Sequence, residues 1–544
     1  MDTKKVILIN SSTPPSYDVE NKYIPLGLMY LASYLKSLGF SVQIKDIQNE
    51  TLGMTEEEYQ AYLKNDFSEY ITNASPDFIG VGVLFSLRYI DSLQIIHAVK
   101  LIFPNVPVAM GGAHATMFTT QILEEQKNID YIVMGEGEDA FGKLLDSHFK
   151  NDELRGINGL AYRSEGNIVI NPKGNDYYME LDDLPFPAYE LINIEDYYMD
   201  TSGWHNPKGI NFHYNFPIIT SRACPRRCSF CALELFQGKK YRARSAKNVC
   251  DEIEFLYSKY DCRYISFIDD NMTVQKQRTI DLMDEIKDRK LDIQFDTSNG
   301  VDLDTFSEEL LDSMVDAGAV RLTVAIETGS EDMRKKILNK HVRNNKIFKF
   351  FKWAEKHEDL ALASFFIIGF PYESHETLNE TAKMIEQIPS LDVVGIHKLV
   401  PFYGTAMFDY CQKEGFIKPD MANIHNEMAS ASYDEKFMVK PEALEMFELE
   451  EFRDLMFEFV AKRRKARILS KNKGVPLEFQ RMTDLTWQKS VKKSRENKSS
   501  VKSKMRVDSK SIDEIKDVTF FNSYSRKNKN SQQISFQKNQ EHLY

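Results

Sequence analysis

At 544 residues, of which 42% are hydrophobic and 28% charged, the chain has the composition of a soluble globular protein with room for about three domains of roughly 150 residues. No apolar run approaches the ~20 residues that span a bilayer, the N-terminus turns polar too soon for a signal peptide, and six cysteines are too few for a disulfide framework, so we expect a cytoplasmic protein. The net charge of -12 divides into -26 over residues 1–460 and +14 over residues 461–544, and the acidic body argues against nucleic acid as a partner.

Residues 1–150 alternate short apolar runs with longer amphipathic segments. Strands are expected at 6–9, 41–47, 78–84, 106–110 and 131–134, and helices near 26–38, 57–71 and 89–102 and after 134. Strands with continuous apolar character, alternating with helices, are typical of a parallel sheet buried on both faces. The pattern predicts an α/β domain with a flavodoxin-like, doubly wound sheet.

Glycine-rich loops follow the last two of these strands. Gly111 and Gly112 come after the fourth strand and lead into His114, and the run from Gly135 to Glu138 comes after the fifth. Ligands of such sheets bind at the carboxyl ends of the strands, and glycine lets the backbone approach a ligand closely. We therefore expect a ligand site here, with plain tight turns as the alternative.

A hairpin and a linker are expected at residues 151–210. Segments 158–162 and 167–171 flank Ser164-Glu165-Gly166, which is a plausible hairpin turn. The stretch 181–189 then carries two prolines with acidic flanks, which marks a domain boundary.

From residue 211 to 430 the alternation of strands and helices resumes. Strands are expected at 218–221, 264–268, 293–297, 321–326, 363–368 and 394–399. Six such units predict a partial (β/α)6 barrel of the TIM type, in which chemistry sits at the carboxyl ends of the strands. Polar loops are expected there at 269–271, 297–300, 327–330 and 369–373. A helical region at 431–470 and a basic, largely disordered tail at 471–544 complete the chain.

A cysteine triplet follows the first barrel strand. Cys224, Cys228 and Cys231 form a C-x3-C-x2-C pattern. A 4Fe-4S cluster has four irons and normally four thiolate ligands, so three cysteines leave one iron open. A zinc site is the alternative, but zinc prefers a second cysteine pair or added histidines, which are missing here. The other three cysteines, at 250, 262 and 411, are expected to be ordinary buried thiols, so no second cluster is predicted.

The triplet, with Phe230 just before its last cysteine, resembles the radical S-adenosylmethionine (SAM) enzymes. In that family the open iron is chelated by the amino and carboxylate groups of SAM, and the reduced cluster cleaves SAM to a 5'-deoxyadenosyl radical. The resemblance implies cofactor contacts from Asp269, Asp270 and Asn271 to the SAM amino group, from Glu327 to the ribose or amino acid moiety, and from the backbone around Gly369 to adenine. Each acidic residue alone has the alternative of a simple strand cap. The resemblance also implies an electron donor such as flavodoxin or ferredoxin.

The first 150 residues resemble the cobalamin-binding domain that precedes the radical domain in one large subfamily. The resemblance assigns seven cofactor-binding residues, namely Gly111, Gly112, His114, Gly135, Glu136, Gly137 and Glu138, with His114 beside the nucleotide tail. The Asp-x-His-x-x-Gly loop, whose histidine ligates cobalt in the wider fold, is missing. No histidine occurs before His97, which we expect on a helix surface, so we predict no imidazole ligand from that loop.

These features predict a cobalamin-dependent radical SAM enzyme. The resemblance favours methylation of an unactivated carbon of a small-molecule or natural-product substrate, by a 5'-deoxyadenosyl radical and methylcobalamin. The alternatives are a cyclase or rearrangement catalyst, like the anaerobic porphyrin ring cyclases, and a non-catalytic cobalamin-binding protein. No motif indicates the substrate.

Overall fold

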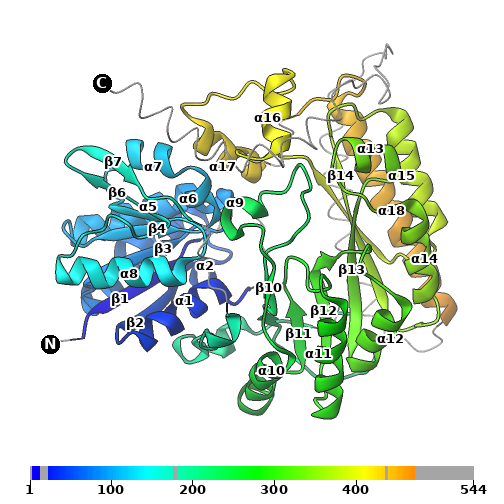
Figure 1. Cartoon of the computed structure of the whole chain (residues 1–544), viewed down its shortest axis with the longest axis horizontal. Helices are drawn as coiled ribbons and strands as arrows, with labels where there is room; N and C mark the ends of the chain where they lie inside the picture. Colours follow the sequence, from blue (N-terminus) through cyan, green and yellow to red (C-terminus); the bar gives the residue numbers. More distant parts are fainter. Residues whose placement is uncertain (1–2, 13–21, 175–179, 202–203, 435–438, 472–544) are drawn as a thin grey trace.

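The computed structural model describes residues 3–12, 22–174, 180–201, 204–434 and 439–471. The predicted disorder of the tail lies outside these residues, apart from Lys471. The chain forms two α/β parts that lie side by side, with the N-terminal sheet on one side and the barrel on the other (Figure 1). No helix within the described ranges is long and apolar enough to cross a membrane.

The N-terminal sheet contains the five predicted parallel strands. They are β1 (Lys5–Asn10), β2 (Ser41–Asp46), β3 (Phe78–Gly82), β4 (Val108–Gly111) and β5 (Tyr131–Val133). The helices of this part are α1 (Leu26–Ser37), α2 (Ile47–Thr51), α3 (Glu56–Tyr62), α4 (Ser68–Ala74), α5 (Tyr89–Ile102), α6 (Ala113–Met117), α7 (Thr119–Glu125) and α8 (Gly137–Lys150). Strands β1 and β3 are almost wholly buried, as expected for a sheet covered on both faces.

The predicted hairpin is part of this sheet. Strands β6 (Leu160–Ser164) and β7 (Asn167–Ile170) extend it to seven strands in the order β2-β1-β3-β4-β5-β6-β7. Strand β6 pairs with β5 in antiparallel register, Ile132 opposite Ala161. The N-terminal sheet therefore continues to Ile170, past the predicted boundary at residue 150.

The second sheet is an open, six-stranded parallel barrel. Its strands are β8 (Phe216–Ile218), β11 (Tyr264–Phe267), β12 (Gln294–Val301), β13 (Ala319–Glu327), β14 (Ala361–Ile368) and β15 (Val393–Lys398), in the order β15-β14-β13-β12-β11-β8. Its helices are α10 (Ala246–Tyr260), α11 (Lys276–Asp288), α12 (Glu308–Ala317), α13 (Glu331–Lys336), α14 (Asn344–Ala354) and α15 (His375–Gln387). All six predicted strands are confirmed in order and type.

Two boundaries differ from the prediction. The first strand is split: after β8 the chain forms β9 (Ser221–Arg222), which pairs in antiparallel fashion with β10 (Arg242–Ala243). The predicted loop at 297–300 is instead part of β12, because a register shift between Thr297 and Val301 lets the strand continue beside β13. Gly300 takes a φ of 94°, which the irregularity requires.

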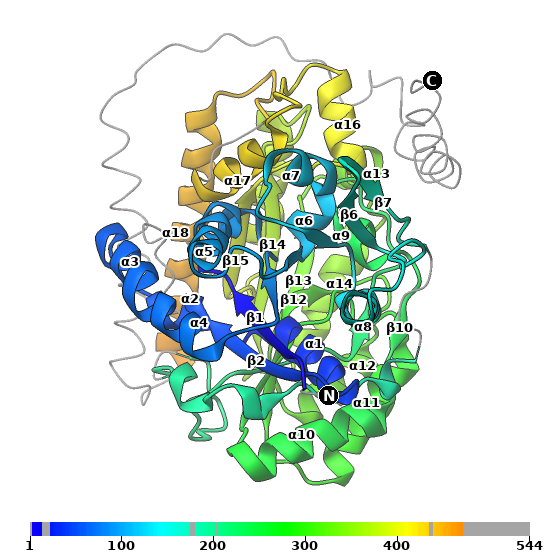
Figure 2. The same cartoon turned by 90° about the vertical axis from the view of Figure 1, so that its left-hand side faces the viewer.

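The C-terminal helices connect the two parts. They are α16 (Ala406–Lys413), α17 (Ile424–Asp434) and α18 (Met446–Lys471). Helix α18 packs along β15 and α15, whereas α17 lies against α5 of the N-terminal part (Figure 2). One buried apolar cluster contains both Phe118 of the N-terminal part and Phe370 and Met428 of the C-terminal half, so the two parts share a core.

Candidate functional site

The cysteine loop is held by a short stem and by several backbone contacts. Strand β9 leads into the loop, and helix α9 (Leu233–Gln237) followed by β10 leads out of it. Ser229 donates a hydrogen bond from its N–H to the Leu338 carbonyl (2.9 Å), and its Oγ donates to the Ile337 carbonyl (2.7 Å). On the other side, the Ala223 N–H donates to Gln237 Oε1 at 2.6 Å. The loop is therefore fixed by the protein itself.

The three predicted cysteines are free thiols on this loop. Cys224 and Cys228 are half-buried and Cys231 is exposed. Within the described residues, no three His, Cys, Asp or Glu side chains are gathered to hold a single metal ion. A cubane makes no such demand, because each thiolate binds a different iron. The donor set fits a 4Fe-4S cluster with one open iron.

Partial burial makes the Cys228 thiol a poor acid in the absence of a metal. It raises the pKa of Cys228 to about 12, although the nearby charge of Lys340 opposes the shift. A coordinating cation deprotonates a thiol outright. The irons of a bound cluster would therefore stabilise the three cysteines as thiolates.

The end of β11 lies directly beneath the cysteine loop. Asn271 donates from Nδ2 toward Cys224 Sγ at 3.6 Å. Burial, and then the charge of Asp269, raise the pKa of Asp270 to about 7, and the Ala223 N–H opposes the shift. The end of β11 therefore lies beside the cysteine loop, and the predicted contact of Asp270 and Asn271 with SAM stays a prediction.

Asp269, at the end of β11, is held by hydrogen bonds from protein groups. Its Oδ1 accepts hydrogen bonds from Thr220 Oγ1 at 2.7 Å and Ser221 Oγ at 2.5 Å, and the Thr220 N–H donates to both carboxylate oxygens at 3.1 Å. The side chain is 3% exposed. These contacts tie the end of β11 to the turn between β8 and β9, so Asp269 supports the loop from below.

Glu327 at the end of β13 is also paired with a protein group. Its Oε1 lies 2.8 Å from Lys340 Nζ, and both side chains are largely buried. Burial alone lowers the pKa of Lys340, but Glu327 and then Cys228 outweigh it, and the net pKa is raised. The prediction named Glu327 as a contact of SAM and missed Lys340, which no motif marks.

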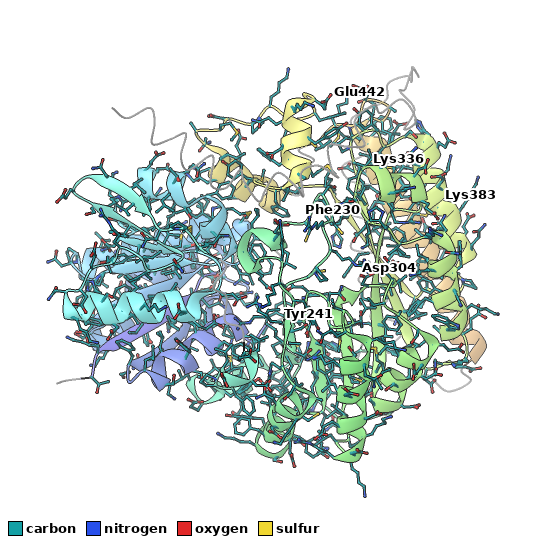
Figure 3. The ribbon with its side chains drawn as sticks, viewed as in Figure 1. Phe230, Tyr241, Asp304, Lys336, Lys383 and Glu442 are labelled. Atoms are coloured by element: carbon teal, nitrogen blue, oxygen red, sulfur yellow. The ribbon has the colours of Figure 1, made fainter. Side chains whose placement is uncertain are left out.

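The fifth strand end forms a tight turn. Gly369, with a φ of 88°, donates its N–H to Glu373 Oε2, and the Phe370 N–H donates to the same oxygen at 3.3 Å. Burial raises the pKa of Glu373 to about 8. The Phe370 ring packs edge-on against Phe230 at 6.3 Å between centroids. Two predicted site segments therefore meet, and Phe230 lies in the central region of the molecule (Figure 3).

The two glycine loops of the N-terminal sheet lie next to each other. Thr116 Oγ1 donates to the Gly112 carbonyl at 2.8 Å and accepts from the Gly135 N–H at 2.9 Å. A Cβ at Gly112, whose φ is 99°, would lie 2.5 Å from the Val83 carbonyl oxygen, so only glycine fits here. Gly112 therefore allows a close approach to the backbone at Val83, whereas the sequence suggested a close approach to a ligand.

Apolar side chains are exposed at this same edge. Leu84 and Phe85, directly after β3, are 58% and 52% exposed. Exposed apolar side chains that lie together at the ligand-binding edge of a sheet offer an apolar contact surface. With the glycine loops beside them, they fit a broad, largely apolar ring such as the corrin of cobalamin.

The carboxylates of the second glycine loop face arginines. Glu136 pairs with Arg242 through both oxygens, at 2.5 and 2.8 Å, and Arg222 contacts Glu136 at 3.2 Å and Glu138 at 2.6 Å. Burial by itself raises the pKa of Glu138, but Arg222 outweighs it and the net pKa is lowered. Sequence reasoning missed both arginines, although Arg222 stands only two residues before Cys224.

His114 is fully buried in α6. Its Nδ1 lies 2.9 Å from Ser86 Oγ, and its ring packs between Tyr89 and Phe118, at 4.4 and 4.8 Å between centroids. Burial, and then the charge of His425, lower the pKa of His114 to about 3. His97 is exposed on α5, as predicted.

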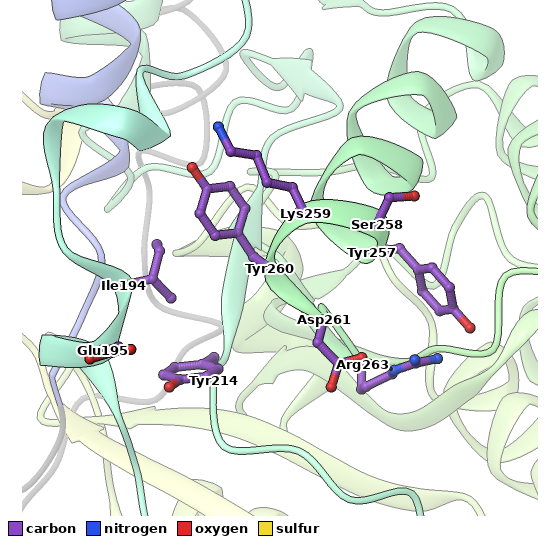
Figure 4. Close-up of a pocket in the computed structure, with 9 residues that line it drawn as sticks. All are labelled: Ile194, Glu195, Tyr214, Tyr257, Ser258, Lys259, Tyr260, Asp261 and Arg263. Carbon is purple, nitrogen blue, oxygen red and sulfur yellow. Dashed lines mark hydrogen bonds and ion pairs between the residues drawn. The ribbon is translucent and has the colours of Figure 1, made fainter.

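A surface hollow of about 590 Å³ lies elsewhere, at the end of α10 (Figure 4). It is lined by Tyr257, Tyr260 and Arg263, and Arg263 immediately precedes β11. This is the amino end of the barrel strands, opposite the cysteine loop. In barrels of this type the chemistry sits at the carboxyl ends, so we do not assign the site to this hollow.

Comparison with known proteins agrees with this division. Residues 17–145 match the B12 binding domain, and residues 218–385 match the radical SAM superfamily. An uncharacterized methyltransferase of Pyrococcus horikoshii is 31% identical over 415 residues, which cover 75% of this chain and 83% of that protein. The anaerobic magnesium-protoporphyrin IX monomethyl ester cyclase of Rubrivivax gelatinosus is 26% identical over 374 residues, covering 68% of this chain and 62% of the cyclase.

A solved structure shares the fold across both parts. The radical SAM methyltransferase TsrM of Kitasatospora setae, solved with cobalamin and a 4Fe-4S cluster, has a TM-score of 0.66 at 16% identity and covers 91% of this chain and 100% of TsrM. A B12-binding sheet joined to a radical SAM barrel with three loop cysteines defines the class of the protein. The chain belongs to the family of cobalamin-dependent radical SAM enzymes.

Proposed function

We propose that this protein is a methyltransferase of that family, and that it methylates an unactivated carbon of a small-molecule substrate. The observation that carries the proposal is the relative from Pyrococcus horikoshii, which bears the name methyltransferase and is 31% identical over a stretch that spans both parts. The fold shared with TsrM, also titled a methyltransferase, supports it.

The residues present would divide the cofactors between the two parts. Cys224, Cys228 and Cys231 would hold the cluster, and Asp270 and Asn271, beside them, would meet SAM. The turn at Gly369 and Phe230 would flank adenine. When bound, the cluster and SAM supply a 5'-deoxyadenosyl radical and cobalamin carries the methyl group, so the protein's task is to orient the three groups and the substrate.

On the N-terminal side, the surface formed by Leu84, Phe85 and the loop at Gly111 and Gly112 would receive the corrin. His114, buried at the start of α6, would lie behind the nucleotide tail without contacting cobalt. A cytoplasmic location and an electron donor such as flavodoxin or ferredoxin complete the proposal, because cluster thiolates require a reducing compartment.

The test uses the anaerobically reconstituted full chain with SAM, cobalamin and a chemical reductant. A methyltransferase of this type consumes SAM in two ways, so both S-adenosylhomocysteine and 5'-deoxyadenosine should form. Mass spectrometry of both products is the readout. Absence of both would contradict an enzymatic role and favour the non-catalytic binding protein.

The second candidate is a cyclase, favoured by the 26% identity to the Rubrivivax enzyme. A cyclase needs the radical but no methyl donor. Sustained formation of 5'-deoxyadenosine without S-adenosylhomocysteine would therefore favour the cyclase over the methyltransferase. Once a substrate is in hand, a gain of one methylene in the product mass identifies methylation.

A further inference from the structure

The stem of the cysteine loop places two arginines opposite each other. Arg222 on β9 pairs directly with Arg242 on β10. The Arg222 side chain is 10% exposed and that of Arg242 only 1%. Like charges directly opposite each other on paired strands are destabilising, and buried charges need partners. The stem therefore requires negative charge from elsewhere.

That charge comes from the other part of the molecule. Glu136 accepts from both Arg242 and Arg222, and Glu138 accepts from Arg222 at 2.6 Å. The two glutamate side chains are 11% and 8% exposed, so little of either carboxylate is left for solvent. Two acids from the loop after β5 thus neutralise two arginines of the stem.

The segment leaving the cysteine loop also contacts the N-terminal part, at Gly135 and after β7. Lys173, which follows β7, donates from Nζ to the Leu235 carbonyl of α9. Gly135 lies so close to α9 that a Cβ there would be 3.0 Å from the Phe236 carbonyl oxygen. Arg242 also donates from Nη2 to the Gln237 carbonyl at 3.3 Å. Both ends of the loop are therefore fastened to the N-terminal sheet.

We propose that Glu136 and Glu138 are positioning residues for the cysteine loop, and not ligands of cobalamin. They hold the loop, and with it the cluster, at a fixed place against the carboxyl edge of the N-terminal sheet. The inference rests on the proposed function only for the identity of the two cofactors. The ion pairs and backbone contacts that carry it are made by the chain's own residues.

Hydrogen exchange of the full chain, read by mass spectrometry under anaerobic conditions, tests the inference. Glu136→Gln leaves two buried guanidinium groups short of a counter-charge. Amides of residues 224–237 should exchange faster by ~tenfold or more, since each factor of ten corresponds to about 1.4 kcal/mol of opening free energy. The matched control is Asp139→Asn, which breaks an exposed pair with Lys143 on the same helix and should leave that segment unchanged.

Cobalamin binding separates positioning from ligation. With the inference correct, Glu136→Gln retains cobalamin, measured by visible absorbance, while the reduced cluster's paramagnetic resonance spectrum broadens because the loop is looser. Loss of cobalamin with unchanged exchange at 224–237 would overturn the inference and return Glu136 to the ligand set. Unchanged exchange with cobalamin retained would overturn it as well.

A second variant keeps the test decisive if Glu136→Gln fails to fold. Lys173→Met removes the tether to α9 without touching the ion pairs, and should speed exchange at residues 233–237. Unaltered exchange there would contradict the anchoring of α9. A failure to detect methyl transfer leaves these exchange comparisons readable, so failure of the proposed function and failure of this inference are distinguishable.

Discussion

The buried pair of Glu327 and Lys340 gives a prediction that separates a structural from a cofactor role. The two groups lie 2.8 Å apart, with side chains 8% and 14% exposed. Removing one partner of a buried ion pair costs ~3–5 kcal/mol. In Glu327→Gln the new amide still offers an oxygen to the Lys340 ammonium, and the lysine has some access to water. We therefore expect the free energy of unfolding to fall by about 2 kcal/mol, near the lower end of the range for hydrogen bonds to charged groups.

The assay is urea unfolding of the cofactor-free chain under reducing conditions, combined in a double-mutant cycle with Lys340→Met. Removing both partners should recover much of the loss, because no charge is then left buried alone. Lys346→Met is the matched control: it breaks a partly exposed pair with Asp304, which is worth well under ~1 kcal/mol. The SAM affinity of the reconstituted Glu327→Gln protein should stay close to that of wild type.

The refuting result is equally specific. A coupling free energy near zero, together with SAM binding weakened by about one to two decades, would show that Glu327 serves SAM directly and that its contact with Lys340 is incidental. In that case the contacts at the end of β13 rearrange when the cofactor binds.

Three further predictions concern the cysteines, cobalt and a buried histidine. The wild-type chain should bind about four irons and four sulfides, and Cys228→Ala should abolish both this cluster and SAM cleavage. The control variant Cys250→Ala should retain both. Reductive SAM cleavage by Cys228→Ala would contradict the ligand assignment. The paramagnetic spectrum of bound cobalt(II) should lack nitrogen splitting, since His114 is buried and His97 lies on a helix surface; a clear nitrogen triplet would contradict this. The pKa of His114 is lowered to about 3 from an ordinary 6.5, so between these pH values the folded chain binds fewer protons than the unfolded chain. The contribution of neutral His114 to the free energy of unfolding is therefore fully present above about pH 6.5. It falls by up to ~1.4 kcal/mol per pH unit as the pH drops below that value. Urea unfolding at pH 5 to 7 should show a shallower slope for His114→Phe than for wild type, and a slope unchanged from wild type would contradict the assignment.

The strands could be predicted because their signal is local. Most barrel strands are largely apolar and are followed by polar residues, and parallel strands buried on both faces leave that pattern in the sequence. The cysteine spacing is equally local, so the sequence alone was enough to propose the cluster ligands. The boundary at 297–300 failed because a strand that continues through an irregularity shows the same polar residues and glycine as a loop.

The partners of the site residues could not be predicted, because they stand on other elements and no motif connects them to the site residues. Lys340 lies 13 residues beyond Glu327, and Arg242 lies 106 residues beyond Glu136. Nothing in the sequence distinguishes a carboxylate that meets a cofactor from one that meets an arginine of another sheet. The antiparallel pairing of β6 with β5 was hidden for the same reason, since a hairpin shows its own turn but not its neighbour.

The arginine stem explains why the two parts of the chain are not independent modules. In the barrel alone, β9 and β10 would present two opposed guanidinium groups with no acid between them, and such a strand pair of two residues each is too short to offset their repulsion. The two carboxylates that neutralise these arginines, Glu136 and Glu138, lie in the loop after β5. This loop is at the edge of the N-terminal sheet where cobalamin would bind. The position of the cysteine loop is therefore set by the N-terminal sheet as much as by the barrel, and any displacement between the two sheets must first separate two buried arginines from their counter-charges.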